Sequence, residues 1–124
     1  MDDLIAFVTA RLDEDEAAAQ AASGDEWKPR ADVGGHWVMP ASPGSAALAE
    51  ALAPELAVAQ AHAAHIARHD PARALREVER KRGLLTDITV AAEYSPSLAD
   101  SMLSELAGIW SDHPDYRPEW APGA

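Results

Sequence analysis

Apolar residues recur at helical spacing along three stretches of the chain, and Gly, Pro and polar residues separate them. Residues 2–22 predict a first helix, which Asp2 or Asp3 can cap and which Ser23 and Gly24 end. At 100° per residue, one side of this helix collects Leu4, Phe7, Val8, Leu12, Ala18, Ala19 and Ala22. That side should face the core.

Two short aromatic or branched runs then flank Gly34 and Gly35. They predict a short β-hairpin near residues 27–39, with an irregular loop as the alternative. A two-stranded hairpin is stable only when it packs on something larger. In either case we expect Trp27 and Trp37 to anchor the segment on the helices.

Residues 45–69 are helical in composition, and Pro54 is either a kink or the first residue of a new helix. Asp70 and Pro71 predict a restart, because Asp is a good N-cap and Pro favours the first helical position. The residue before a proline also resists the helical conformation. We expect a bend there, and then a helix to about residue 86.

Residues 86–96 hold a branched run too short for periodicity to separate strand from helix, so we treat them as a connector. Ser97 and Asp100 resemble a capping box with a shorter acid. One apolar stripe follows, formed by Leu98, Met102, Leu106, Ile109 and Trp110. This stripe predicts the final helix.

The tail, residues 113–124, cannot be regular helix with its prolines at their spacing. Tyr116 and Trp120 should therefore hold it across the surface as an extended clamp. Together these elements predict one mainly α domain over residues 1–124, with three or four helices and the short hairpin.

Composition narrows the possible functions. Twenty-eight alanines against one Phe and two Tyr indicate a core of closely packed Ala and Leu helices. The absence of Cys excludes disulfides, thiolate metal sites and Cys nucleophiles. A net charge of -11 repels nucleic acid and anionic lipid and favours basic partners. With no apolar run near the roughly 20 residues of a membrane span, we expect a cytoplasmic protein without a membrane partner.

Residues 65–82 hold six of the ten Lys and Arg residues. Arg73, Arg76 and Arg80 follow one another at spacings of three and four, which suits a phosphate or an acidic partner. A small nucleic-acid binder using these residues and Arg82 is possible, although the net charge disfavours it. The alternative pairs the arginines within the fold, with Glu77, Glu79 or the acidic run from Asp13 to Glu16.

His62, His65 and His69 could present imidazoles to zinc or another divalent metal from one helix face. The spacing of the last two matches the helical pair of zinc proteases. However, Ile66 stands where that motif requires a catalytic Glu, which rejects a protease of that kind. A metal site would need a third ligand, for example Asp70, His36 or His113; the alternative is exposed or interface histidines on an Ala-rich helix.

The chain contains no Gly-x-Ser-x-Gly turn and no Gly-rich phosphate loop, so no catalytic residues are predicted. Aromatic and Arg side chains dominate recognition sites. We therefore predict that a partner is bound by Arg73, Arg76, Arg80, Tyr116 and Trp120.

Three motifs stand at the start, centre and end of the chain. They are Asp-Leu-Ile-Ala-Phe with Ala-Arg-Leu-Asp-Glu-Asp-Glu (3–7 and 10–16), His-Ile-Ala-Arg-His-Asp-Pro-Ala-Arg (65–73) and Asp-His-Pro-Asp-Tyr-Arg-Pro-Glu-Trp (112–120). In this order they resemble a family of small proteins of unknown function from actinobacteria and their phages. The resemblance carries over no activity or site residues. Many relatives have cysteines before the last helix, and this chain has none.

The function predicted is a non-enzymatic acidic interaction or regulatory protein, of a kind that a phage or mobile element encodes, which binds a host protein. One version is an acidic mimic of nucleic acid. The alternatives are a metal-binding protein or hydrolase centred on the histidines, and a small nucleic-acid binder acting through the arginine helix.

Overall fold

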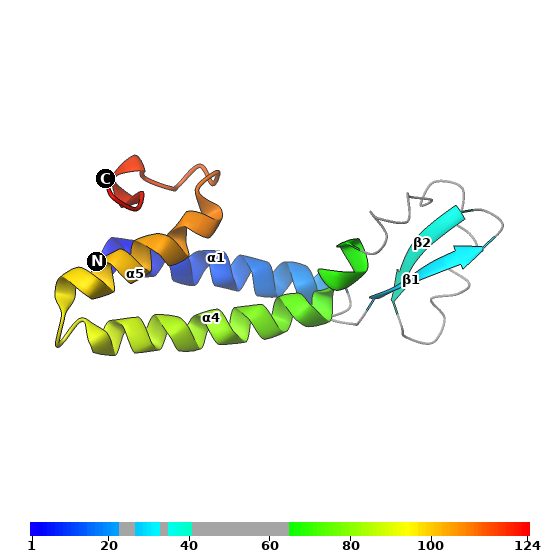
Figure 1. The fold of residues 1–124 in the computed structure, drawn as a ribbon, viewed down its shortest axis with the longest axis horizontal. Helices are drawn as coiled ribbons and strands as arrows, with labels where there is room; N and C mark the ends of the chain where they lie inside the picture. The colour runs from blue at the N-terminus through cyan, green and yellow to red at the C-terminus, as the bar shows by residue number, and fades with distance from the viewer. Residues whose placement is uncertain (23–26, 33–34, 41–64) are drawn as a thin grey trace. The chain divides into compact units, whose positions relative to one another are not determined.

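The computed structural model describes residues 1–22, 27–32, 35–40 and 65–124. Three long helices dominate them, α1 (Asp2–Ala21), α4 (Pro71–Ala91) and α5 (Pro96–Ala107) (Figure 1). The other elements are two strands, β1 (Trp27–Asp32) and β2 (Gly35–Pro40), and two 3-10 turns, η1 (Gly108–Trp110) and η2 (Pro118–Trp120). The prediction of a mainly α fold is confirmed. None of the helices described is long and apolar enough to span a membrane.

The chain divides into two compact units. The first unit consists of Met1–Asp15 and Val78–Ala124, and the second unit is Glu16–Glu77. Helices α1 and α4 each run through both. The single domain predicted for residues 1–124 stays a prediction.

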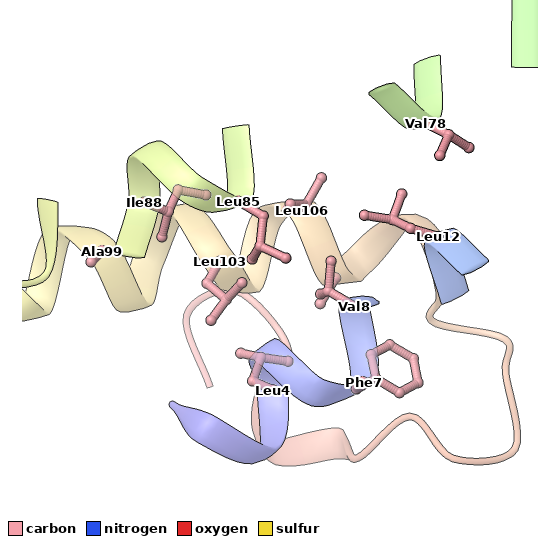
Figure 2. Close-up of a cluster of buried hydrophobic side chains, with 11 residues drawn as sticks. Leu4, Phe7, Val8, Leu12, Val78, Leu85, Ile88, Ala99, Leu103 and Leu106 are labelled. Atoms are coloured by element: carbon pink, nitrogen blue, oxygen red, sulfur yellow. The ribbon is translucent and has the colours of Figure 1, made fainter. Parts of the chain in front are cut away.

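The core of the first unit is formed by one face each of α1, α4 and α5 (Figure 2). It consists of Leu4, Phe7, Val8, Leu12, Val78, Leu85, Ile88, Ala99, Leu103, Leu106 and Ala107. Of the seven residues of the first helix that the helical wheel predicted to face the core, the four large ones do so and Ala19 is also buried, whereas Ala18 is exposed and Ala22 is only partly buried. Burial of each large aliphatic side chain contributes about 1.5–3 kcal/mol. The small side chains of Ala99 and Ala107 leave room for α5 to pack closely.

Helix α4 continues to Ala91, so the connector predicted from residue 86 is wrong over its first half. The reason is Ile88, which is completely buried and extends the apolar face one turn beyond Leu85. Gly83 lies on the exposed side of the helix. It costs only about 0.5–1 kcal/mol relative to Ala, which the burial of Ile88 outweighs.

Helix α5 begins at Pro96, and Ser95 is its N-cap residue, so the capping box predicted from Ser97 and Asp100 is wrong. Pro96 stands at the first helical position, where its missing N–H costs no hydrogen bond and its fixed φ suits the helix. Helical backbone then continues through η1 to Trp110.

In the second unit, β1 and β2 pair as antiparallel strands, with Trp27 opposite Pro40 and Asp32 opposite Gly35. The side chain of Trp37, the second expected anchor, lies outside the described residues. Residues 65–68 are helical. The rest of the helix predicted over residues 45–69, including Pro54, also lies outside the described residues.

Candidate functional site

The restart predicted at Asp70 and Pro71 is confirmed. The helix of residues 65–68 ends before Asp70, and α4 begins at Pro71. The Asp70 carboxylate accepts two backbone hydrogen bonds, at Oδ1 from the N–H of Arg73 (2.8 Å) and at Oδ2 from the N–H of Trp27 (3.0 Å). The first is the N-cap bond of α4. The second ties the start of β1 to the start of α4.

Asp70 is only 8% exposed, and burial alone raises the pKa of a carboxyl group. The hydrogen bonds from Arg73 and Trp27, with the charges of Arg76 and Arg73, outweigh burial and hold the pKa of Asp70 below its ordinary value. Both carboxylate oxygens are therefore engaged within the fold. This makes Asp70 a poor third ligand for the predicted histidine metal site.

Two of the arginines predicted to bind a partner are held by acids of the same helix. Arg73 Nε donates to Glu77 Oε1 at 2.7 Å, and Arg80 Nη2 donates to Glu79 Oε1 at 2.8 Å. These are pairs that the sequence offered as the alternative to a binding site. Arg76 is exposed on the same helix. Such partly exposed ion pairs contribute only about 0–1 kcal/mol each, so they hold the arginine side chains only weakly.

The next basic residues of α4 pack onto α1 and η1. Arg82 Nη2 donates to Asp13 Oδ1 at 2.7 Å, and the ammonium group of Lys81 lies 5.5 Å from the ring centroid of Trp110. Trp110 Nε1 in turn donates to Asp15 Oδ2 at 3.1 Å. The acidic run of α1 thus pairs with the basic stretch of its own chain, as the alternative to a binding site predicted.

His65 and His69 lie beside each other on the last helical turn before Asp70. Their ring centroids are 4.5 Å apart with the planes inclined at 47°, and both side chains are exposed. His62, the third member of the predicted set, lies outside the described residues. Within the described ranges, no three His, Asp or Glu side chains are close enough together to hold a metal ion.

Tyr116 and Trp120 pack on Phe7 of α1, as predicted for the aromatic residues of the tail. The Phe7 centroid lies 5.8 Å from that of Tyr116 and 5.1 Å from that of Trp120. Arg117 stacks over the Trp120 ring at 4.9 Å and donates to Asp3 Oδ2 at 3.1 Å. Both rings are partly buried against the core, so this part of their surface already serves the fold.

A buried arginine also joins the tail to α1. The Arg11 side chain is 7% exposed, and its Nη2 donates to Glu14 Oε1 at 2.7 Å. Its Nη1 donates to His113 Nδ1 at 2.7 Å and lies 3.5 Å from Asp115 Oδ2. The guanidinium stands over the Phe7 ring at 5.1 Å from the centroid. Opposite charge and the ring face together compensate the burial of this cation.

The contacts of His113 determine its tautomer. Its Nδ1 accepts hydrogen bonds from Arg11 and, at 3.1 Å, from the backbone N–H of Asp115. The proton of the neutral ring therefore belongs on Nε2, which lies 3.9 Å from Glu14 Oε2. Neither ring nitrogen offers a free lone pair, so His113 in this arrangement is not the third metal ligand that the sequence suggested.

After Arg82 the character of the chain changes. Residues 83–116 contain no Lys or Arg. Their acidic side chains are Asp87, Glu93, Asp100, Glu105, Asp112 and Asp115. The part of α4 after Arg82 and all of α5 therefore carry only negative formal charge.

Three large apolar side chains are exposed around the turn from α4 to α5, the bend where the ribbon of Figure 1 passes from α4 into α5. The exposed fractions are 53% for Val90, 83% for Tyr94 and 54% for Leu98. The acidic side chains next to them along the chain are also exposed. We define the α4–α5 corner as Asp87, Val90, Glu93, Tyr94, Leu98 and Asp100.

Residues 1–122 match the model of a family of unknown function, DUF6221. The chain belongs to DUF6221. The match spans the three motifs at the start, centre and end of the chain, and it confirms the resemblance to a family of unknown function. No curated protein and no solved structure matches the chain.

The predicted site of this DUF6221 protein is divided between the two units. Arg73 and Arg76 belong to the second unit with His65 and His69, whereas Arg80, Tyr116 and Trp120 belong to the first. Within the described residues, His65 and His69 form one close pair, and Tyr116 and Trp120 form another.

Two features of the DUF6221 chain escaped the sequence reasoning. Arg11 lies three residues after Val8 and four after Phe7, so it falls on the apolar side of the first helix. A charged residue at such a position is the sequence feature that indicates a buried, paired side chain. The α4–α5 corner was signalled by the long stretch without basic residues. Val90 also falls off the buried stripe of α4, but it lies beyond the helix end predicted near residue 86.

Proposed function

We propose that this DUF6221 protein is a non-enzymatic interaction or regulatory protein that binds a basic region of a host protein through its acidic surface. The supporting observation is an asymmetry of charge in the first unit. Its basic side chains are engaged within the chain, whereas residues 83–116 keep an excess of acid. A host-binding role also agrees with the resemblance to a family found in actinobacteria and their phages.

Each basic side chain of the first unit has an identified partner within the chain. Arg11 holds Glu14, Arg80 holds Glu79, Arg82 holds Asp13, Arg117 holds Asp3, and Lys81 stacks on Trp110. A surface left with surplus negative charge attracts cationic partners at long range and repels nucleic-acid backbones and anionic lipid. The acidic surface therefore favours a basic protein, including one whose own ligand is nucleic acid.

The two buried polar sites of the described chain support a role without catalysis. The Asp70 carboxylate caps α4 and holds Trp27, and the Arg11 guanidinium holds the tail. The Asp70 carboxylate oxygens and the two terminal nitrogens of Arg11 make their hydrogen bonds within the fold, whereas the buried Arg11 Nε has no hydrogen-bond partner among the described residues. A catalytic acid, base or nucleophile needs an atom that can reach a substrate.

The test is affinity purification of the tagged, nuclease-treated protein from lysate of its host, at low and at high salt, followed by mass spectrometry. We expect a stoichiometric basic protein that high salt releases. In an acid-neutralised variant (Asp87→Asn, Glu93→Gln, Asp100→Asn) retention should fall. The matched control neutralises three cations instead (Arg73→Gln, Arg76→Gln, Arg80→Gln) and should retain the partner.

Two results contradict this proposal. Retention of no protein at low salt contradicts a protein-binding function. Loss of the partner in the arginine variant, with retention in the acid-neutralised variant, moves the binding surface to the arginine helix.

The close pair formed by His65 and His69 favours metal binding as a second candidate, because two adjacent imidazoles supply half of a tetrahedral zinc site. Titration calorimetry with zinc should then give one equivalent bound by the wild type and none by His65→Ala or His69→Ala. Equal zinc binding by all three proteins contradicts this candidate. A hydrolytic role would follow only from bound metal.

A further inference from the structure

The three apolar side chains of the α4–α5 corner lie within nine residues of one another along the chain, around a single turn. Single exposed apolar residues are common on protein surfaces. A group of them rimmed by polar residues marks an interaction site more often than chance exposure. Tyr94 stands out, because an aromatic side chain of this size is rarely left so open to solvent.

Helix geometry places part of the corner opposite the core. Ile88 points into the core, and Val90 follows two residues later, about 200° further around the helix. Asp87 lies three residues before Val90 and shares its outer face. Tyr94 follows in the turn that continues α4, and Leu98 lies in the first turn of α5, so the three exposed apolar side chains come from the end of α4, the turn and the start of α5.

Internal pairing does not account for the acids of the corner. Asp87, Glu93 and Asp100 form no ion pair with any other residue in the described part of the chain. Helix electrostatics does not account for Asp87 and Glu93 either. The last turn of α4 has no basic residue, and carboxylates near a helix C-terminus are disfavoured by about 0.3–1 kcal/mol each. The placement of these two acids therefore lowers the stability of the isolated chain.

The negative charge of the α4–α5 corner also indicates which kind of partner binds there. A second copy of this chain would bring the same acids against each other, and like charges across an interface oppose association. A segment that carries Lys or Arg beside apolar residues would relieve the repulsion near the end of α4 and cover the exposed side chains. An amphipathic basic helix presents both kinds of residue on one side.

We propose that the α4–α5 corner is the docking surface for a basic amphipathic helix of a partner protein. This inference rests on the proposed function and specifies its surface and its partner. Apolar side chains of the partner cover Val90, Tyr94 and Leu98. Its Lys or Arg side chains approach Asp87, Glu93 and Asp100.

The probe is a fluorescent synthetic helix with Leu at spacings of three and four and Lys elsewhere, and its analogue has Glu in place of Lys. Binding to the full chain is measured by fluorescence anisotropy and mapped by backbone amide chemical shifts. We expect the Lys peptide to bind with shifts concentrated at residues 87–100, and the Glu peptide not to bind.

The variants are Tyr94→Ser and, as a matched control, Ile109→Ser. Ile109 is 52% exposed and lies in η1, beyond the C-terminal end of α5, so both changes remove an exposed apolar side chain from the acidic stretch 83–116. Loss of a central aromatic anchor weakens binding about 30-fold or more. We expect this loss for Tyr94→Ser and less than a twofold change for Ile109→Ser.

Three results overturn the inference: no binding of the Lys peptide, equal weakening by both variants, or chemical-shift changes spread over the whole acidic surface. Dimerisation of the wild type through residues 87–100, detected by sedimentation and chemical shifts, also overturns it in favour of a second copy.

Affinity purification with Tyr94→Ser separates the two proposals. A basic partner retained equally by wild type and variant leaves the proposed function standing and overturns the corner. A wild type that retains no partner overturns the proposed function, whatever the peptide does.

Discussion

Replacement of Asp70 by Ala removes two hydrogen-bond acceptors with one change. Loss of the N-cap bond to Arg73 costs roughly 0.5–2 kcal/mol. The N–H of Trp27 also loses its acceptor, which costs about 1–3 kcal/mol where no replacement is found. The free energy of unfolding should therefore fall by roughly 2–4 kcal/mol, as measured by urea denaturation followed by circular dichroism.

Asp70→Asn is the matched control. Asn remains a good N-cap, but its side-chain amide has one acceptor oxygen in place of two. It should lose about half as much stability as Asp70→Ala. If Asp70→Ala stays within about 0.5 kcal/mol of the wild type, the ordinary range of a neutral surface change, then Asp70 does not perform both roles.

The pH dependence supplies a second test. The pKa of Asp70 is lower in the folded than in the unfolded chain. Its ionised form therefore stabilises the fold fully above the unfolded pKa of about 3.9, and this contribution disappears as pH falls through the folded pKa. The stability difference between wild type and Asp70→Asn should be constant near neutrality and shrink below about pH 4. A difference that persists unchanged into acid would refute the role of the ionised carboxylate.

Other changes test the core and the tail. Leu103→Ala, at a completely buried position, should cost about 2–5 kcal/mol in denaturation experiments, whereas Leu98→Ala, at an exposed one, should change stability by less than about 0.5 kcal/mol. Trp110→Phe should cost about 0.5–1.5 kcal/mol, because the hydrogen bond to α1 is lost while the aromatic packing remains. Arg11→Met should speed amide hydrogen exchange across residues 113–120 and leave the middle of α4 protected; equal acceleration in both regions would contradict a local role for Arg11.

Local chemistry was enough to predict several elements. The stripe from Leu4 to Leu12 and the restart at Asp70 depend on residues within one or two helical turns, and short-range spacing and capping signals report such features directly. The ion pair of Arg73 with Glu77 also belongs to this class, because residues four apart on a helix are neighbours.

Predictions from local sequence were wrong where contacts between residues far apart in the chain determine the structure. The run within residues 86–91 is compatible with strand and with helix until Ile88 is placed in a core shared with α1 and α5. The N-cap of α5 was misplaced by two residues, since Ser95 and Ser97 offer similar signals and the choice depends on how α5 packs.

The sequence by itself determined the helical class, the restart of the helix at Asp70, and a strongly acidic chain that favours basic partners. Only the tertiary structure decided which charges neutralise one another, as when Arg82 meets Asp13 and Arg11 meets Asp115 across long sequence separations. It also decided that Tyr94 stays exposed while Trp120 packs on Phe7. The physical reason is that ion pairing and burial depend on distance in space, which the fold sets, whereas helix signals depend on neighbours along the chain.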